Sequence, residues 1–160
     1  MLELKKVTSV QTRMRIIKLL NVLGGEVVEF YIDPTWPNSL RWFLVQDLCS
    51  FTPWHFIQKD NEFDFAAKAF KKEDVSGGEV FVFASRQDND DFAGLEIIDG
   101  KITEKVICFH PVFSMGESKR EWHIVDETYV DVFEFVSKQV IEDMKDWALV
   151  EDASELAGNI

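Results

Sequence analysis

Three carboxylates lie close together in the stretch RQDNDD, at Asp88, Asp90 and Asp91. Grouped carboxylates can bind hard cations such as Ca²⁺, and they can also act as general acids or bases. An EF-hand loop that began at Asp88 would need glycine at its sixth position and glutamate at its twelfth, where this chain has Ala93 and Asp99. The EF-hand pattern therefore fails. A solvated turn, in which Asp and Asn side chains bond to their own backbone, is the commoner structure for such a cluster.

Histidine and cysteine offer a second kind of chemistry. Cys108 and His110 are two residues apart on an expected strand and so share a face. With Cys49, His55 or His123 they could form a zinc site, or a cysteine nucleophile activated by histidine. No pair has the spacing that zinc sites usually show, and a cysteine in an apolar strand is usually inert. We therefore interpret Cys108 as a buried thiol and His110 as a hydrogen-bonded side chain.

The chain contains none of the short motifs GxGxxG, GxSxG, HExxH or Walker A. The enzymatic alternative is a metal-dependent hydrolase that uses Asp88, Asp90 and Asp91 together with His110 or His123. Nothing in the sequence marks a substrate pocket beside these carboxylates. We therefore favour a non-enzymatic protein that needs neither a cofactor nor a metal.

Tryptophan is enriched among the residues that dominate protein interfaces. Trp36 lies in the loop DPTWPNS, where two prolines prevent a regular strand ladder. We expect Trp36 to be more exposed than Trp42, Trp54 and Trp122. Together with the three aspartates of RQDNDD, Trp36 is our candidate for partner binding.

Composition narrows the kind of partner. The chain has 160 residues, which suits one domain, and 46% of them are hydrophobic. Its 29 acidic and 17 basic residues give a formal net charge of −12. Such a charge repels nucleic acid, favours solubility and would steer the chain towards a basic protein.

The sequence also bears on the compartment. No apolar run approaches the roughly 18 residues that span a bilayer, and the first 20 residues lack the apolar core and cleavage site of a signal peptide. The two cysteines lie far apart and show no disulfide framework, which suits a reducing compartment. We expect a cytoplasmic protein that does not bind membranes, and the oligomeric state stays open.

Hydrophobic spacing of three and four predicts three helices. The first covers residues 10–23 and ends at Gly24-Gly25, and the second runs from about residue 60 to 72. The third is capped by Thr128 and runs to residue 147, with Phe133 among the side chains of its apolar face. The segment after residue 149 is an acidic tail that we expect to fray.

β-branched and aromatic residues predict the strands. We expect strands at 26–32, 40–48, 80–84, 92–98, 101–109 and 122–125. Residues 50–57 contain Pro53, so they form an edge strand or a packed loop. Asp99-Gly100 between two β-rich runs indicates a hairpin with a type I′ turn. These elements predict a single α+β domain over residues 1–160.

Residues 80–147 resemble the SUKH superfamily of bacterial toxin-immunity proteins and fungal cell-wall-synthesis regulators. The resemblance lies in VFVFAS, in DNDDFAGLEI, in the Asp99-Gly100 hairpin and in the closing helix TYVDVFEFVSKQV, and TPWHFI upstream is also similar. It implies a curved, mainly antiparallel sheet flanked by an N-terminal, a middle and a long C-terminal helix. It also implies a cytoplasmic binding protein that neutralises a cognate toxin domain or acts as a regulatory scaffold.

Overall fold

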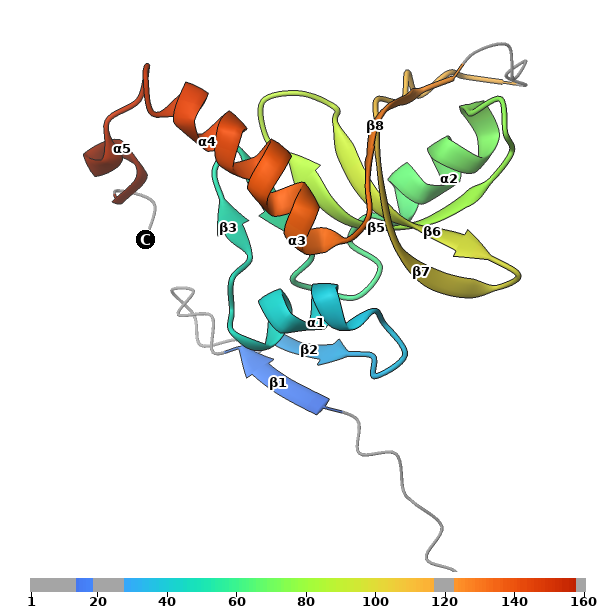
Figure 1. The fold of residues 1–160 in the computed structure, drawn as a ribbon, viewed down its shortest axis with the longest axis horizontal. Coiled ribbons are helices and arrows are strands. Elements are labelled where there is room, and N and C mark those ends of the chain that lie inside the picture. The colour runs from blue at the N-terminus through green and yellow to red at the C-terminus, as the bar shows by residue number, and fades with distance from the viewer. Residues whose placement is uncertain (1–13, 19–27, 117–122, 158–160) are drawn as a thin grey trace, which may run out of the picture.

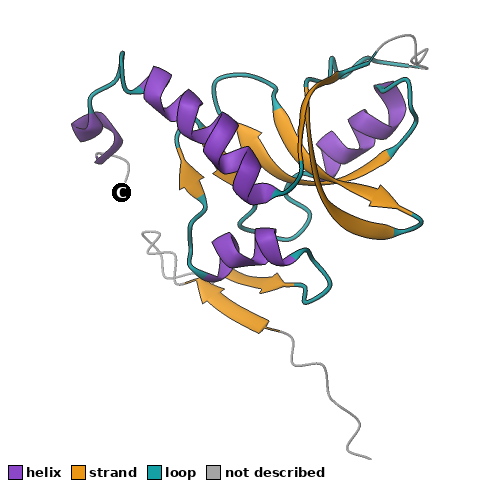
Figure 2. Ribbon diagram, in the orientation of Figure 1, coloured by secondary structure: helices purple, strands orange, loops and turns teal. Residues whose placement is uncertain are grey.

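The computed structural model of this chain describes residues 14–18, 28–116 and 123–157 (Figure 1). In these residues an open, six-stranded antiparallel sheet has the strand order β3-β4-β5-β6-β7-β8, and a separate antiparallel pair is formed by β1 and β2. Helices flank the six-stranded sheet (Figure 2). The α+β class and the antiparallel sheet predicted from the sequence are confirmed.

Three long strands form the centre of this sheet, where their apolar content predicted them. They are β5 (Glu79–Arg86), β6 (Phe92–Ile98) and β7 (Lys101–Phe109). Between β6 and β7, Asp99 and Gly100 have φ angles of 50° and 73°. A type I′ turn requires positive φ at both central residues, so the predicted hairpin turn is confirmed.

Shorter strands extend the sheet on both sides. Strands β3 (Ser50–Phe51) and β4 (Trp54–Phe56) form a small hairpin around Pro53, and β4 pairs with β5. This is the edge structure that the proline predicted. On the other side β8 (Val125–Tyr129) pairs with β7. The predicted strand at 122–125 thus lies further along the chain, and Trp122 is outside the described residues.

The amino-terminal helix predicted at residues 10–23 is wrong where it can be tested. Residues Met14–Lys18 form strand β1, which pairs with β2 (Val28–Ile32), and the rest of the predicted helix lies outside the described residues. Helix propensity is a weak preference that tertiary contacts override. The strand partner supplied by β2 decides the conformation here.

The strand predicted at residues 40–48 is also wrong, because α1 (Asn38–Val45) occupies this position. Its buried side chains Leu40, Phe43 and Leu44 follow the helical period and face the core. Pro37 precedes the first turn, where a missing N–H costs nothing. The aromatic and branched residues that suggested a strand therefore form one buried side of a helix.

The middle and C-terminal helices are confirmed, with different boundaries. Helix α2 covers Asp64–Glu73. The C-terminal helix is continuous through α3 (Val132–Phe135), a π-helical turn η1 (Val136–Val140) and α4 (Ile141–Trp147), and the short α5 (Ala153–Ala157) follows. No helix among the described residues is long and apolar enough to cross a membrane.

The start of the C-terminal helix differs from the prediction. Thr128 is not its cap, because Thr128 lies in β8 opposite Ile107. Asp131 is the cap instead, and its Oδ1 accepts a hydrogen bond of 2.8 Å from the Glu134 amide. A side-chain acceptor at this position satisfies one of the free amides of the first turn.

Aromatic rings fill the space between the sheet and the C-terminal helix. The buried Phe135 ring lies 5.2 Å from Trp54, 5.8 Å from Phe83 and 5.7 Å from Tyr129, measured between ring centroids. These rings come from β4, β5 and β8, so one helical side chain contacts three strands. Burial of such rings is a main source of stability in a domain of this size.

Two buried carboxylates connect the end of α2 to the chain between β7 and β8. Glu73 accepts hydrogen bonds from the amides of Val112 and Ser114, at 2.8 and 2.9 Å. Asp74 accepts from the Ile124 amide at 3.1 Å, and also from the amide and hydroxyl of Ser76. Backbone donors thus compensate the cost of burying these charges.

Candidate interaction surface

The acidic loop (residues 87–91) joins β5 to β6 and is held by its own side chains. Arg86 donates from Nε to Asp88 Oδ1 at 2.8 Å and from Nη2 to Asp88 Oδ2 at 3.2 Å. Asn89 accepts from the Asp91 amide and donates to the Asp91 carboxylate, at 2.9 and 2.8 Å. The predicted self-bonded turn is therefore confirmed, and Asp90 remains exposed at its tip.

A histidine from the end of β7 contacts the same loop. His110 Nδ1 lies 2.7 Å from Asp91 Oδ1. The hydrogen bond to Asp91 raises the pKa of His110, burial opposes this, and the charges of Asp91, Asp126 and Asp90 add to the rise. Burial, followed by the Asp91 charge, also raises the pKa of Asp126, although His110 opposes it. Negative charge is therefore concentrated at this end of the sheet.

Arg86, at the end of β5, connects the acidic loop to the C-terminal helix. Asp143 of α4 accepts from Trp54 Nε1 at 2.7 Å and from Gln139 Nε2 at 2.8 Å. Arg86, which holds Asp88, also lies 3.5 Å from the Asp143 carboxylate. The acidic loop and α4 are thus neighbours in space, although they are more than 50 residues apart in the chain.

The structure shows the surroundings of the groups considered for metal binding and catalysis. Among residues 14–18, 28–116 and 123–157, no group of three or more His, Cys, Asp or Glu side chains could hold a metal ion. Burial, followed by the charges of Asp126 and Asp91, raises the pKa of Cys108 far above its usual range. A thiol that stays protonated is a poor nucleophile. Cys108, which is buried, is therefore a poor candidate for the cysteine nucleophile considered from the sequence.

Trp36 is less exposed than we expected from its loop. Its ring lies 4.8 Å from that of Phe81 and 6.2 Å from that of Phe30, and it packs partly buried against the core. Trp42 on α1 is 55% exposed. The sequence analysis therefore expected the wrong tryptophan to be the more exposed one, because α1 was not recognised as a helix.

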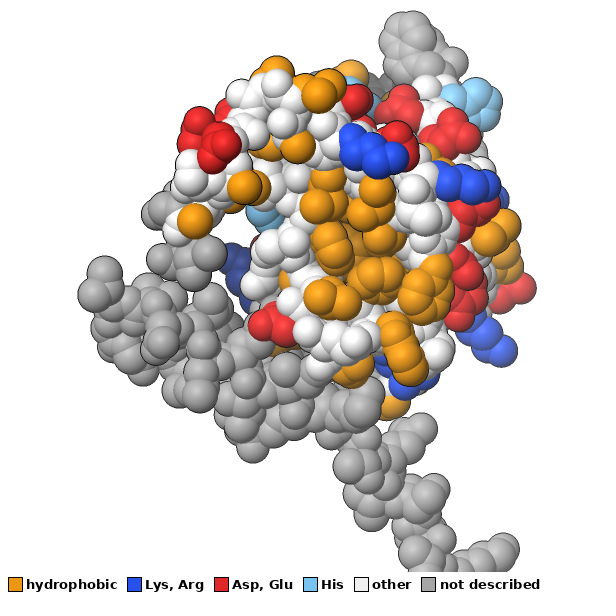
Figure 3. Space-filling view, turned by 60° about the vertical axis from the view of Figure 1, so that its left-hand side comes forward, with side chains coloured by type: hydrophobic (Ala, Val, Ile, Leu, Met, Phe, Trp, Pro, Cys, Tyr) orange, Lys and Arg blue, Asp and Glu red, His pale blue; other side chains and the backbone are white. Residues whose placement is uncertain are grey.

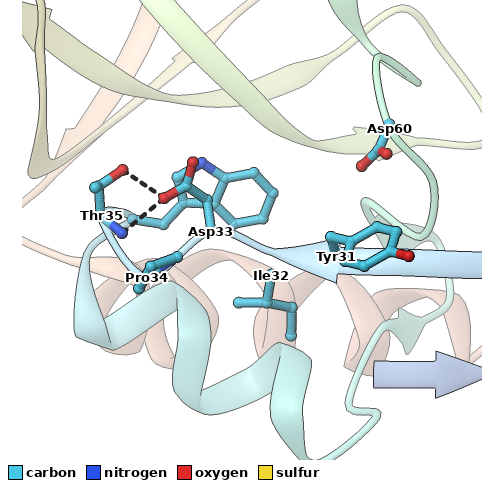
Figure 4. A pocket seen from close by; sticks show the side chains of 7 residues that line it. Tyr31, Ile32, Asp33, Pro34, Thr35 and Asp60 are labelled. Carbon is cyan, nitrogen blue, oxygen red and sulfur yellow. Dashed lines mark hydrogen bonds between the residues drawn. The ribbon is translucent and has the colours of Figure 1, made fainter. Parts of the chain in front are cut away.

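A cleft of about 500 Å³ opens beside Trp36, and Figure 4 shows its lining. Tyr31 and Asp60 lie on one side of it, and Asp33 and Thr35 lie on the other. The Asp33 carboxylate accepts from the amide and the hydroxyl of Thr35, at 2.8 and 2.7 Å. Carboxylates and aromatic rings together attract cations, so the cleft suits a basic side chain.

The structure does not bring Trp36 and the three aspartates together. Trp36 contacts Phe81 near the start of β5, whereas the acidic loop follows Arg86 at the end of the same strand. Five residues of strand span roughly 16 Å. The residues proposed from the sequence therefore belong to two separate regions of the surface.

A third region was missed by the sequence analysis. The apolar face, as we call it, consists of exposed side chains from α1 and the turn after it and from the C-terminal helix: Trp42, Val45, Leu48, Phe133 and Ile141. Figure 3 turns the side of the molecule with β3 and α4 forward, and hydrophobic side chains gather in its middle with charged side chains at the border.

One buried ring connects the two helices that carry the apolar face. Phe43 of α1 lies 5.3 Å from Phe133 of α3 and 6.1 Å from the partly buried Phe51 of β3. Phe133 was expected on the buried side of its helix, but it is 46% exposed. A signal was present in the sequence, since Trp42 and Val45 share a face at helical spacing.

Comparison of the chain with protein-family models, with curated proteins and with solved structures finds no match. The functional argument therefore depends on the chemistry of the surface described above.

Proposed function

We propose that this protein is a non-enzymatic protein-binding module of the SUKH type. It binds a basic protein in the cytoplasm, either to neutralise a cognate toxin domain or as a regulatory scaffold. The observation that supports this proposal most is the acidic loop, whose shape is held by Arg86 and Asn89 while Asp90 is exposed at its tip.

The net charge supports the same class of partner. A charge of −12 creates a field that accelerates encounter with a basic protein and disfavours encounter with an acidic one. A loop that keeps its shape before binding also loses little conformational entropy on association. The sequence resemblance to immunity proteins adds a biological setting in which such binding is useful.

Reversal of the charge of Asp90 should slow association with the partner. For Asp90→Lys we expect the association rate constant for the proposed basic toxin domain to fall several-fold at low salt, because charges at a rim act mainly on the encounter rate. Stopped-flow fluorescence measures this rate. The unfolding temperature should stay within about 2 °C, because Asp90 is exposed.

Asp99→Lys is the matched control, because Asp99 is an exposed aspartate in the turn at the end of β6, away from the acidic loop. It changes the net charge by the same amount. Equal slowing by both variants would show a general effect of net charge and would remove the acidic loop from the recognition surface.

A further inference from the structure

We propose that the apolar face is the docking site for a basic protein partner that presents an apolar ridge. This inference rests on the proposed function and assigns it a surface. The acidic loop then forms part of the charged border of the interface rather than its centre.

The apolar face has the properties of an interface centre. Its five large hydrophobic side chains are each between 37% and 55% exposed, and they come from α1 with the turn after it and from the C-terminal helix, which contact each other through Phe43 and Phe133. Contiguous exposed apolar surface is uncommon on monomers and marks interaction sites. Trp42 is the natural anchor, since tryptophan is the residue type most enriched where truncation costs binding energy.

The face is also rigid before binding. Phe133 and Phe51 both contact the buried Phe43, which in turn lies 5.8 Å from the buried Phe56 of β4. The exposed ring of Phe133 therefore rests on the core instead of on a loop. Preorganisation of this kind reduces the entropy lost when two proteins associate.

Charge complementarity identifies the partner as basic. Residues 132–157 contain seven acidic residues and only two lysines. Both lysines are already paired, Lys138 with Glu134 at 2.5 Å and Lys145 with Glu142 at 2.6 Å. Further along, a hydrogen bond with Glu155, followed by the charge of Glu155, raises the pKa of Glu151, so two more carboxyl groups lie close together there.

The acidic loop continues this border. Arg86 bridges Asp88 and Asp143, so the loop lies beside α4, the helix that carries Ile141. A partner with an apolar ridge on the face would therefore meet carboxylates from both the helix and the loop. Basic side chains around the ridge would pair with them.

A second copy of this chain is a poor occupant of the same face. Each copy carries a net charge of −12, and a symmetric contact would place identical acidic borders against each other. Like charges placed opposite each other at an interface oppose association. The face therefore favours a partner of opposite charge.

Three dye-labelled helical peptides of about 18 residues, which is five turns, test the inference. The first has a leucine face and lysines elsewhere, the second has the same lysines but alanine in place of leucine, and the third has leucines with glutamates. Fluorescence anisotropy at about 0.15 M salt measures their binding. We expect one-to-one binding of the leucine–lysine peptide, and binding at least about tenfold weaker for the other two.

Variants then locate the binding site on the protein. We expect Trp42→Ser and Phe133→Ser each to weaken binding of the leucine–lysine peptide by about tenfold or more. Ile98→Ser should change it by less than about twofold, since Ile98 is 53% exposed but lies at the β6–β7 hairpin, on the other side of the molecule (Figure 1). Circular dichroism confirms that each variant is folded.

Four results would overturn the inference. The first two are that the leucine–lysine peptide does not bind, or that the alanine–lysine peptide binds with the same affinity as the leucine–lysine peptide. The third is that the Trp42→Ser and Phe133→Ser variants bind the leucine–lysine peptide as tightly as the wild type does. The fourth is that the chain alone forms a dimer, which Trp42→Ser dissociates. If the basic toxin domain still binds the chain in these cases, the proposed function stands and only the surface is wrong. If that domain does not bind, the proposed function fails as well.

Discussion

Replacement of Phe135 by alanine is expected to lower the free energy of unfolding by about 3–5 kcal/mol, which is the usual cost of deleting a buried aromatic ring. Phe135 is fully buried, and its ring contacts Trp54, Phe83 and Tyr129 from three different strands. Alanine would leave a cavity between the C-terminal helix and the sheet. Urea unfolding followed by circular dichroism measures the change.

Phe133→Ala is the matched control in the same helix. Phe133 is 46% exposed and contacts one buried ring, so we expect a loss of about 1 kcal/mol or less. The two variants should thus separate two roles: Phe135 supports the fold, and Phe133 belongs to the apolar face. Equal destabilisation by both would contradict the orientation of this helix.

The second large effect is expected at Asp74, for which Asp74→Asn should cost about 2–3 kcal/mol at neutral pH. Asp74 is 1% exposed and accepts from Ser76 and Ile124. The asparagine keeps one acceptor oxygen. Its NH₂ group, however, takes the place of the second carboxylate oxygen and so faces donors with a further donor. It also removes the charge that strengthens these hydrogen bonds.

The same site predicts a dependence on pH. Burial raises the pKa of Asp74, but the hydrogen bonds from Ser76 and Ile124 and the nearby His123 outweigh it and hold the pKa below the ordinary value of 3.8. The folded protein therefore holds this proton less tightly than the unfolded chain does. The ionised carboxylate stabilises the fold above the unfolded value, and this contribution is lost as the pH falls through the folded value.

Unfolding curves of the wild type and Asp74→Asn between neutral and acid pH measure both effects. We expect the difference in free energy to be largest at neutral pH and to shrink below about pH 4. Asp60→Asn is the control, since Asp60 is exposed and its replacement should change stability by less than about 0.5 kcal/mol. A difference that stayed constant with pH would show that the charge of Asp74 is irrelevant.

Local patterns in the sequence were sufficient for the centre of the fold. The apolar runs of β5, β6 and β7 and the Asp99-Gly100 turn carry strong signals within a few residues, and the structure follows them. The same holds for α2 and the C-terminal helix, whose hydrophobic spacing extends over several turns. Such elements need little tertiary information.

The errors occurred where a tertiary partner decides the conformation. Residues 14–18 show helical spacing but form β1, which pairs with β2. Residues 40–48 have a strand-like composition, but those up to Val45 belong to α1, whose apolar side packs against the core. The second error had a functional consequence. Without α1, the exposure of Trp42 and the contact of Phe43 with Phe133 could not be inferred, so the apolar face was missed.

The three aspartates illustrate a partial success. The sequence excluded an EF-hand and indicated a self-bonded turn, and both the Asn89 contacts and the Arg86–Asp88 pair agree with that turn. Its position beside α4 depends on the long-range contact between Arg86 and Asp143. No pattern in the sequence marks such a contact in advance.

The most direct test of the central claim is a calorimetric titration of this protein with the purified toxin domain proposed as its basic partner, at about 0.05 and 0.5 M salt. We expect a one-to-one complex whose affinity falls at the higher salt, because an acidic surface meets a basic one. The complex should also suppress the activity of the toxin domain. Absence of heat at both salt concentrations, or binding that leaves the toxin active and is insensitive to salt, would contradict the account.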